Sequence, residues 1–302
     1  MSSVSILRCG WYAVEIFETA STLKVLGSTS RGVFLQAPRD QVLLLSYDPY
    51  AGPLTANLNG STHALRNMTP GEVFQITPQA LVHPYVTVLR AAPPPWREPE
   101  PLGQTLSPHL RNDLLIQAAE ITSREKGSAG YAQLLLPVLH RQPPPDGSEN
   151  IYAQLLILSA NLAGDLQAAA VQSAIPFLGW GHGLTPSGDD FLDGLILFYS
   201  RWPLLSPLPP ADTEEFCSSI LQAAKSRTTS LSVSLLELAV LKTGDERLIA
   251  AVDCLAAGST ELKDWLPRLL TYGSSSGGDA LLGMALAAEA FHSAQSNNNA
   301  PD

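Results

Sequence analysis

Residues 179–194 hold the densest group of side chains that could do chemistry. They run Gly-Trp-Gly-His-Gly-Leu-Thr-Pro-Ser-Gly-Asp-Asp-Phe-Leu-Asp-Gly. The first glycines, Gly183 among them, allow a ligand to approach the main chain closely. Thr185 before a proline, and Ser187 three residues before Asp190, each signal the start of a helix. Because the first amides of a helix lack partners within the helix, this stretch predicts a site for a small anionic metabolite.

Three carboxylates, Asp189, Asp190 and Asp193, lie at the start of the same predicted helix. Their spacing of three or four residues places them on one helix face. Two carboxylates in a first turn repel an anion unless a cation or a hydrogen-bond donor lies between them. We therefore expect either Mg²⁺ held by Asp189 and Asp190, or an ammonium or amide group of the ligand, to occupy this position.

The pattern returns 89 residues later, in Gly-Ser-Ser-Ser-Gly-Gly-Asp-Ala-Leu-Leu-Gly at 273–283. Both stretches contain Ser-Gly-x-Asp-x-Leu-x-Gly, here called the SGxD motif; the first copy is 187–194 and the second is 276–283. In each copy, the glycine one turn after the aspartate lets a neighbouring helix pack closely. We infer that the two helix N-termini face one shared site. The alternative is that both motifs are ordinary capping boxes.

A third segment, Arg-Thr-Thr-Ser-Leu-Ser at 227–232, lies between the two motifs. Arg227 could pair with a carboxylate or a phosphate through two parallel hydrogen bonds, and the hydroxyls of Thr228 and Thr229 could bind a ligand. The alternative is a helix N-cap next to a surface base.

These observations give a set of candidate site residues. The candidate catalytic residues are Asp189, Asp190 and Asp279, of which the first two are also candidate Mg²⁺ ligands. The candidate ligand-binding residues lie in or beside the motifs or in the third segment: Gly183, Thr185, Ser187, Gly188, Asp193, Arg227, Thr228, Thr229, Ser275, Ser276 and Gly277. Since no Ser-His-Asp arrangement, Walker loop or GxGxxG motif is present, we expect catalysis by positioning and electrostatics rather than by a covalent nucleophile.

The strings Gly-Leu-Thr-Pro-Ser-Gly-Asp-Asp-Phe-Leu-x-Gly and Gly-x-Ser-Ser-Gly-x-Asp-x-Leu-x-Gly, with the segment 227–232 between them, resemble a bacterial family of formerly unknown function. That family includes the AllH-type subunit of oxamate carbamoyltransferase. The resemblance implies a β-rich N-terminal part, a helical C-terminal part and partner subunits in a carbamoyltransferase complex of anaerobic allantoin breakdown. Such a complex exchanges a carbamoyl group between oxalurate and phosphate. His182 and Gly278 depart from the family pattern.

Composition excludes several classes of protein. The 302-residue chain has a formal charge of −10 and only 18 Lys and Arg, which argues against nucleic acid as a partner. Its three cysteines are isolated and odd in number, as in a reducing compartment. No apolar run reaches the length of a membrane span, and the N-terminus lacks the apolar core of a signal peptide. We expect a soluble cytoplasmic protein without a membrane partner.

The periodicity of apolar residues predicts an α+β fold. Residues 1–92 are expected to form a small β-barrel or sandwich, and Asn59-Gly60 signals a hairpin. Residues 93–104 form a Pro-rich linker, 105–292 an α-helical domain that carries both SGxD motifs and ends its last helix at Phe291, and 293–302 a disordered tail. The predicted strands are 14–17, 23–26, 32–36, 42–46, 54–58, 73–77 and 85–89.

Three hypotheses for the function follow. The first is an enzyme or enzyme subunit that binds phosphate, carbamoyl phosphate or a similar small anion between the two helix N-termini. The second is a Mg²⁺-dependent hydrolase that uses the aspartate cluster. The third is a non-catalytic structural or regulatory subunit whose motifs serve packing, with partner subunits or further copies of this chain bound to its apolar helical half.

Overall fold

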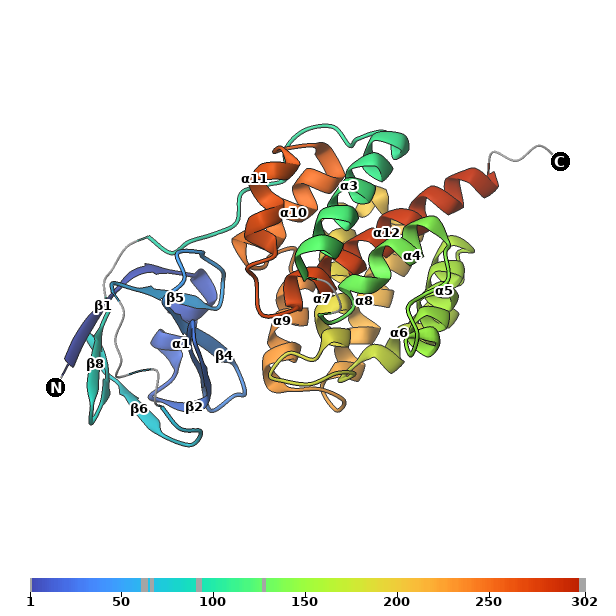
Figure 1. Cartoon of the computed structure of the whole chain (residues 1–302). Coiled ribbons are helices and arrows are strands. Elements are labelled where there is room, and N and C mark those ends of the chain that lie inside the picture. The colour runs from blue at the N-terminus through green and yellow to red at the C-terminus, as the bar shows by residue number, and fades with distance from the viewer. Residues whose placement is uncertain (1, 61–64, 66–67, 91–93, 127–128, 299–302) are drawn as a thin grey trace. The chain divides into compact units, whose positions relative to one another are not determined.

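The computed structural model describes residues 2–60, 65, 68–90, 94–126 and 129–298. The chain divides into two compact units. The barrel unit comprises Met1–Pro99 and Gly244–Glu246, and the helical unit comprises Glu100–Thr243 and Arg247–Asp302. Figure 1 labels β1, β2, β4, β5, β6, β8 and α1 in the first unit and α3 to α12 in the second. The predicted fold class, α+β with an N-terminal barrel before a helical region, is confirmed.

The barrel unit is a closed sheet in the order β1-β5-β4-β3-β2-β6-β7-β8. The β1–β8 and β4–β5 pairs are parallel and the remaining pairs are antiparallel. Because side chains alternate along a strand, residues such as Val33 and Leu35 fill the interior of the barrel. The strands are β1 (Ser2–Cys9), β2 (Thr22–Thr29), β3 (Gly32–Gln36), β4 (Val42–Ser46), β5 (Thr55–Leu58), β6 (Val73–Ile76), β7 (Ala80–His83) and β8 (Val86–Leu89).

Two expectations for the barrel are wrong. The predicted strand 14–17 lies in a helix, α1 (Trp11–Thr19), because Ala13, Ile16 and Phe17 form one buried face at helical spacing. The hairpin predicted at Asn59-Gly60 does not form, since β5 pairs with β1 and β4 instead of with the next strand. The strands β1 and β7 were not predicted.

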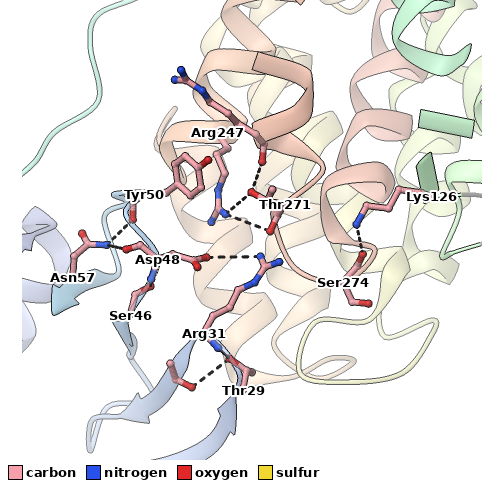
Figure 2. Close-up of polar contacts among 12 residues, drawn as sticks. Thr29, Arg31, Ser46, Asp48, Tyr50, Asn57, Lys126, Arg247, Thr271 and Ser274 are labelled. Atoms are coloured by element: carbon pink, nitrogen blue, oxygen red, sulfur yellow. Dashed lines mark hydrogen bonds and ion pairs between the residues drawn. The ribbon is translucent and has the colours of Figure 1, made fainter. Parts of the chain in front are cut away.

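A buried amide fixes the loop between β4 and β5. Asn57 donates hydrogen bonds of 2.8 and 2.7 Å to the carbonyl oxygens of Asp48 and Tyr50 (Figure 2). A side chain of strand β5 therefore fixes the loop that precedes this strand.

The helical unit is built around two buried helices, α7 (Ser187–Arg201) and α12 (Ser276–Asn298). Residues 188–199 and 276–288 are buried throughout. None of the helices in the described chain has both the length and the apolar character needed to cross a membrane. The other elements of this unit are α3 (Pro108–Lys126), η1 (Ala132–Leu134), α4 (Leu135–His140), α5 (Glu149–Ala163), α6 (Gln167–Ala174), η2 (Ile175–Phe177), η3 (Pro203–Leu205), α8 (Pro210–Ala224), α9 (Ser230–Val240), α10 (Glu246–Ala257) and α11 (Leu262–Leu269).

The last helix is longer than predicted. It continues to Asn298 rather than ending at Phe291, so residues 293–298 of the predicted tail are helical. Residues 299–302 lie outside the described part of the chain.

The glycines of the two SGxD motifs bring α7 and α12 into contact. A methyl group on Gly194 would lie 2.1 Å from the carbonyl oxygen of Ala280, and one on Gly283 would lie 2.0 Å from that of Phe191. Positions 194 and 283 correspond in the two motifs, as do positions 191 and 280. The contact is therefore pseudo-two-fold: each glycine packs against the same position of the other copy.

A buried ion pair fixes the far end of α7. Arg201 contacts Asp253 of α10 through Nε–Oδ1 and Nη2–Oδ2 distances of 2.6 and 2.8 Å, and Trp202 Nε1 donates to the same carboxylate at 2.9 Å. Because both oxygens of Asp253 have partners, the burial of this charge is compensated. The ion pair holds α7 against α10 at the end opposite to the first motif.

Candidate functional site

Each SGxD helix begins at the serine of its motif. In the first copy, the amide of Gly188 donates to the Trp180 carbonyl at 2.8 Å, and a methyl group on Gly188 would lie 2.0 Å from the carbonyl oxygen of Phe177. The preceding loop is therefore folded directly onto the start of α7, and only glycine fits at position 188.

The second copy has the same local structure. The amide of Gly277 donates to the Tyr272 carbonyl at 2.9 Å, and a methyl group on Gly277 would lie 2.1 Å from the carbonyl oxygen of Leu269. Both Gly188 and Gly277 were predicted to bind ligand. Their close backbone contacts show that they shape the two loops, and their binding of a ligand stays a prediction.

The aspartates of the two motifs are buried beside each other's serines. Asp190 is 2 % exposed and Asp279 is 0 % exposed, and the Oδ2 atom of each has no hydrogen-bond partner in the described structure. Ser276 of the second motif interacts with Asp190, and Ser187 of the first motif interacts with Asp279. The two motifs thus form one cluster, in which the serine of each motif lies beside the aspartate of the other, as the shared-site inference requires. Each motif supplies one carboxyl group with an oxygen that has no partner in the described structure.

Burial dominates the electrostatics of this cluster. It raises the pKa of Asp279 to about 6, against the opposing effects of the Tyr131 amide and the hydroxyls of Ser275 and Ser187. Burial also raises the pKa of Asp190 well above its ordinary value, and the nearby charges of Asp279, Asp193 and Asp189 add to the increase. These carboxyl groups therefore take up protons more readily than carboxyl groups in water.

Asp189 connects the first motif to two other segments. Its Oδ1 accepts the amide of Gly179 at 2.8 Å, and its Oδ2 accepts the hydroxyl of Thr228. Burial raises the pKa of Asp189, while Thr228 and Gly179 oppose the increase. Since both of its oxygens have partners within the chain, Asp189 positions the loop and the segment that precedes α9. Asp193 is buried one turn further along α7.

The sequence suggested two roles for the segment 227–232, ligand binding or helix capping, and its residues differ in which role they fit. Thr229 is the N-cap of α9, because its hydroxyl accepts the Ser232 amide at 3.1 Å and donates to the Leu184 carbonyl at 2.7 Å. The hydroxyl of Thr228 instead donates to Asp189. The side chain of Arg227 is exposed, while its carbonyl oxygen would lie 2.4 Å from a methyl group on Gly179.

The remaining predicted residues lie at the edge of the cluster. The hydroxyls of Thr185 and Ser276 are 3.5 Å apart, so the loop of the first motif touches the second motif. Ser275 interacts with Asp279. Gly183 is exposed, and a methyl group there would have no neighbour within 4 Å.

Three amides in the first turn of each SGxD helix are already bound within the chain. Those of Gly188, Asp189 and Asp190 donate to the carbonyls of Trp180 and Pro186. The corresponding amides of the second motif, at positions 277, 278 and 279, donate to the carbonyls of Tyr272 and Ser275. Because these six donors are already used, hydroxyls and cations would have to hold an anion here.

The cluster does not have the geometry of a metal site. Among residues 2–60, 65, 68–90, 94–126 and 129–298, no three or more His, Cys, Asp or Glu side chains are grouped so as to hold a metal ion. The Mg²⁺ hypothesis for Asp189 and Asp190 therefore has no support from the arrangement of these side chains, and it stays a prediction.

Three site residues were not found by sequence reasoning. The amide of Tyr131 donates to Asp279 Oδ1 at 2.5 Å, and a methyl group on Gly130 would lie 2.3 Å from the same oxygen. Lys126, at the end of α3, donates to the Ser274 carbonyl at 2.9 Å (Figure 2). In the sequence, Gly130 signals a turn, but no local pattern connects this turn to the second motif.

Asp279 should make the protein more stable in mild acid. Its pKa is about 6 in the folded state and near 3.8 when solvated, so between these values the folded state binds a proton that the unfolded state releases. The free energy of unfolding therefore falls as the pH rises through this window, and the penalty is complete above the folded pKa. Linkage predicts a loss of roughly 2 kcal/mol between about pH 4.5 and about pH 7.5 from this group.

Urea denaturation of the wild type and of Asp279→Asn at these two pH values measures this contribution. The variant should lose less stability as the pH rises, by the amount above. A residual slope of the same sign is expected, because the pKa values of Asp189 and Asp190 are also raised. Identical pH dependence in the two proteins would contradict the assignment.

Comparison with known families agrees with the resemblance seen in the motifs. Residues 177–288 match the family model described as oxamate carbamoyltransferase subunit AllH. This range contains both SGxD motifs and the segment 227–232, and it leaves out residues 1–99 of the barrel unit and Tyr131. No curated protein and no solved structure matches the chain.

Proposed function

We propose that this chain is a subunit of oxamate carbamoyltransferase, or of an enzyme related to it, and that it binds a small anionic metabolite of the phosphate or carbamoyl phosphate class between the first turns of α7 and α12. The family match over 177–288 supports the first part. The observation that carries the second part is the pair of buried, unpartnered carboxylate oxygens on Asp190 and Asp279.

Unpartnered carboxylate oxygens inside a protein are costly, and buried polar groups without a partner often mark the position of a ligand or an ion. Here one such oxygen comes from each motif, at equivalent positions of a pseudo-two-fold cluster. When the two carboxyl groups are ionised, both oxygens are acceptors, so the part of the ligand that reaches them must then carry hydrogen-bond donors. The NH₂ group of a carbamoyl compound or of an amide provides two.

In this proposal, hydroxyl groups and the cationic side chain of Arg227 bind the anionic end of the ligand. Thr185 and Ser276 lie together where the two motifs meet, and Ser275 lies beside Asp279. The segment next to Asp189 contributes the exposed Arg227, whose charge suits phosphate or carboxylate. The proposed ligand therefore has its amide end at the aspartates and its anionic end at the hydroxyls.

Asp190 and Asp279 are also the proposed catalytic residues. Moving a carbamoyl group from a nitrogen to a phosphate oxygen breaks a C–N bond, forms a C–O bond and requires a proton on the leaving nitrogen. A carboxyl group with a pKa near 6, as at Asp279, can give up and take back a proton at neutral pH. Asp189 acts as a positioning residue, because its oxygens are already bound within the chain.

A thermal-shift screen of the purified chain tests the proposal. The ligands are phosphate, carbamoyl phosphate, oxamate and oxalurate, each with and without Mg²⁺. A ligand at about one hundred times its dissociation constant should add roughly 2.7 kcal/mol to the free energy of unfolding. We expect a compound that contains a carbamoyl or amide group to shift the midpoint without Mg²⁺. No shift with any of the four would contradict the proposal, and a shift only with Mg²⁺ would favour the metal hypothesis.

We further propose that the chain acts in the bacterial cytoplasm together with partner subunits. The family description names a subunit, which implies a complex. Size-exclusion chromatography of the chain with its co-expressed partners should show a larger species than the chain alone.

A further inference from the structure

The phenol of Tyr131 is a buried donor that the chain leaves unused. Tyr131 is 8 % exposed, and its hydroxyl has no hydrogen-bond partner within the described part of the chain. A buried hydroxyl without a partner costs free energy, so its retention needs an explanation.

The backbone of Tyr131 is fixed against the second motif. Its amide donates to Asp279 Oδ1 at 2.5 Å, and its carbonyl oxygen accepts the Leu134 amide at 2.9 Å. Gly130 has a φ of +56°, and a methyl group there would lie 2.3 and 2.6 Å from the two carboxylate oxygens of Asp279. The chain therefore turns directly over this carboxyl group, and only glycine permits that approach.

The charges of the aspartate cluster also act on the phenol of Tyr131. Burial raises the pKa of the phenol, and the charges of Asp279 and Asp189 raise it further. Tyr131 is therefore protonated at neutral pH and can donate a hydrogen bond. The charges of two carboxylates act on this hydroxyl, and it donates to neither of them within the described part of the chain.

The segment around Tyr131 breaks the pseudo-symmetry of the two motifs. Gly278 of the second motif corresponds to Asp189 of the first, and a methyl group on Gly278 would lie 3.1 Å from the Ala132 Cβ. The segment 130–132 thus packs where a longer side chain at position 278 would project. The first motif is covered instead by Gly179 and Thr228. A ligand in the cluster therefore meets different groups on its two sides.

We propose that the Tyr131 hydroxyl donates a hydrogen bond to an oxygen atom of the metabolite bound at Asp190 and Asp279. This inference rests on the proposed function, and it assigns a ligand-binding residue outside the range 177–288 that matches the family. The two aspartates accept hydrogen bonds from the ligand, and Tyr131 supplies the donor for an adjacent carbonyl or anionic oxygen. An amide or ureido group, with N–H donors beside a C=O acceptor, meets both requirements.

The test compares Tyr131→Phe with Tyr152→Phe in the intact chain. Tyr152 is half-buried on α5, and its hydroxyl donates to the Pro137 carbonyl at 3.3 Å. Removing an unpaired hydroxyl should leave the melting temperature unchanged or slightly higher, whereas removing a paired one should lower it. For the affinity we expect the reverse order: Tyr131→Phe should weaken binding of carbamoyl phosphate or oxamate about ten-fold, and Tyr152→Phe should leave it unchanged.

Each outcome of this experiment distinguishes the two proposals. Equal affinity of the wild type and Tyr131→Phe overturns the role of Tyr131 and leaves the proposed function standing. A lower melting temperature for Tyr131→Phe also overturns it, because the hydroxyl would then have a structural partner. If the wild type binds neither compound, the proposed function fails and the role of Tyr131 fails with it.

Discussion

Gly283→Ala should lower the free energy of unfolding of the helical unit by at least about 3 kcal/mol, a large part of the 5–15 kcal/mol that stabilises a typical domain. The added methyl group would lie 2.0 Å from the Phe191 carbonyl oxygen and 2.7 Å from the Leu195 amide nitrogen. Both are backbone atoms of a buried helix, so neither can move aside without separating α7 from α12. Urea denaturation followed by far-UV circular dichroism, which reports mainly on helices, measures the loss.

Gly278→Ala is the matched control in the same helix. The nearest atom to its added methyl group is the Ala132 Cβ at 3.1 Å, a methyl group rather than backbone. Because alanine favours a helix over glycine by about 1 kcal/mol, this variant should stay within about 1 kcal/mol of the wild type. Similar losses in the two variants would show that the α7–α12 contact is not tight.

The pseudo-two-fold contact adds a prediction about non-additivity. Gly194→Ala should cost about as much as Gly283→Ala, since each methyl group meets the equivalent carbonyl of the other helix. Once one methyl group has separated the helices, the second has more room. The double variant should therefore lose less stability than the sum of the two single losses.

The sequence predicted much of the fold where local patterns decide the structure. The strands at 32–36 and 42–46 were located to the residue, because apolar runs there are bounded by turn signals. Residues 11–19 were missed, since the short run 14–17 fits a strand and only the wider spacing of Ala13, Ile16 and Phe17 reveals a helix. Short apolar runs do not distinguish the two elements.

The candidate site was predictable to the extent that it is repeated. The recurrence of Ser-Gly-x-Asp predicted that Asp190 and Asp279 belong together, and each aspartate lies beside the serine of the other motif. Tyr131 was not predictable, because it meets Asp279 across 148 residues of sequence and has no repeated counterpart. The sequence did not reveal that the amides at 188–190 and 277–279 are already bound, since only the folded loops bring the accepting carbonyls to them.

Asp190→Asn should separate stability from ligand binding. The wild-type carboxyl group is buried, has one oxygen without a partner and lies near the charges of three other aspartates. Asparagine is nearly isosteric and carries no charge, so the variant should melt at or above the wild type. Its advantage should grow as the pH rises, because only the wild type then has to ionise a buried group.

Ligand affinity should change in the opposite direction. A hydrogen bond to a charged group contributes about 1.5–3 kcal/mol, so replacing the acceptor should weaken binding of carbamoyl phosphate or oxamate roughly ten- to hundred-fold. Asp264→Asn, an exposed carboxylate on α11, is the control and should change neither property. If Asp190 served only as a helix cap, its substitution would lower the melting temperature and leave affinity unaltered. A variant that is more stable and binds less tightly would show that this carboxylate is kept, at a cost to the fold, for the ligand.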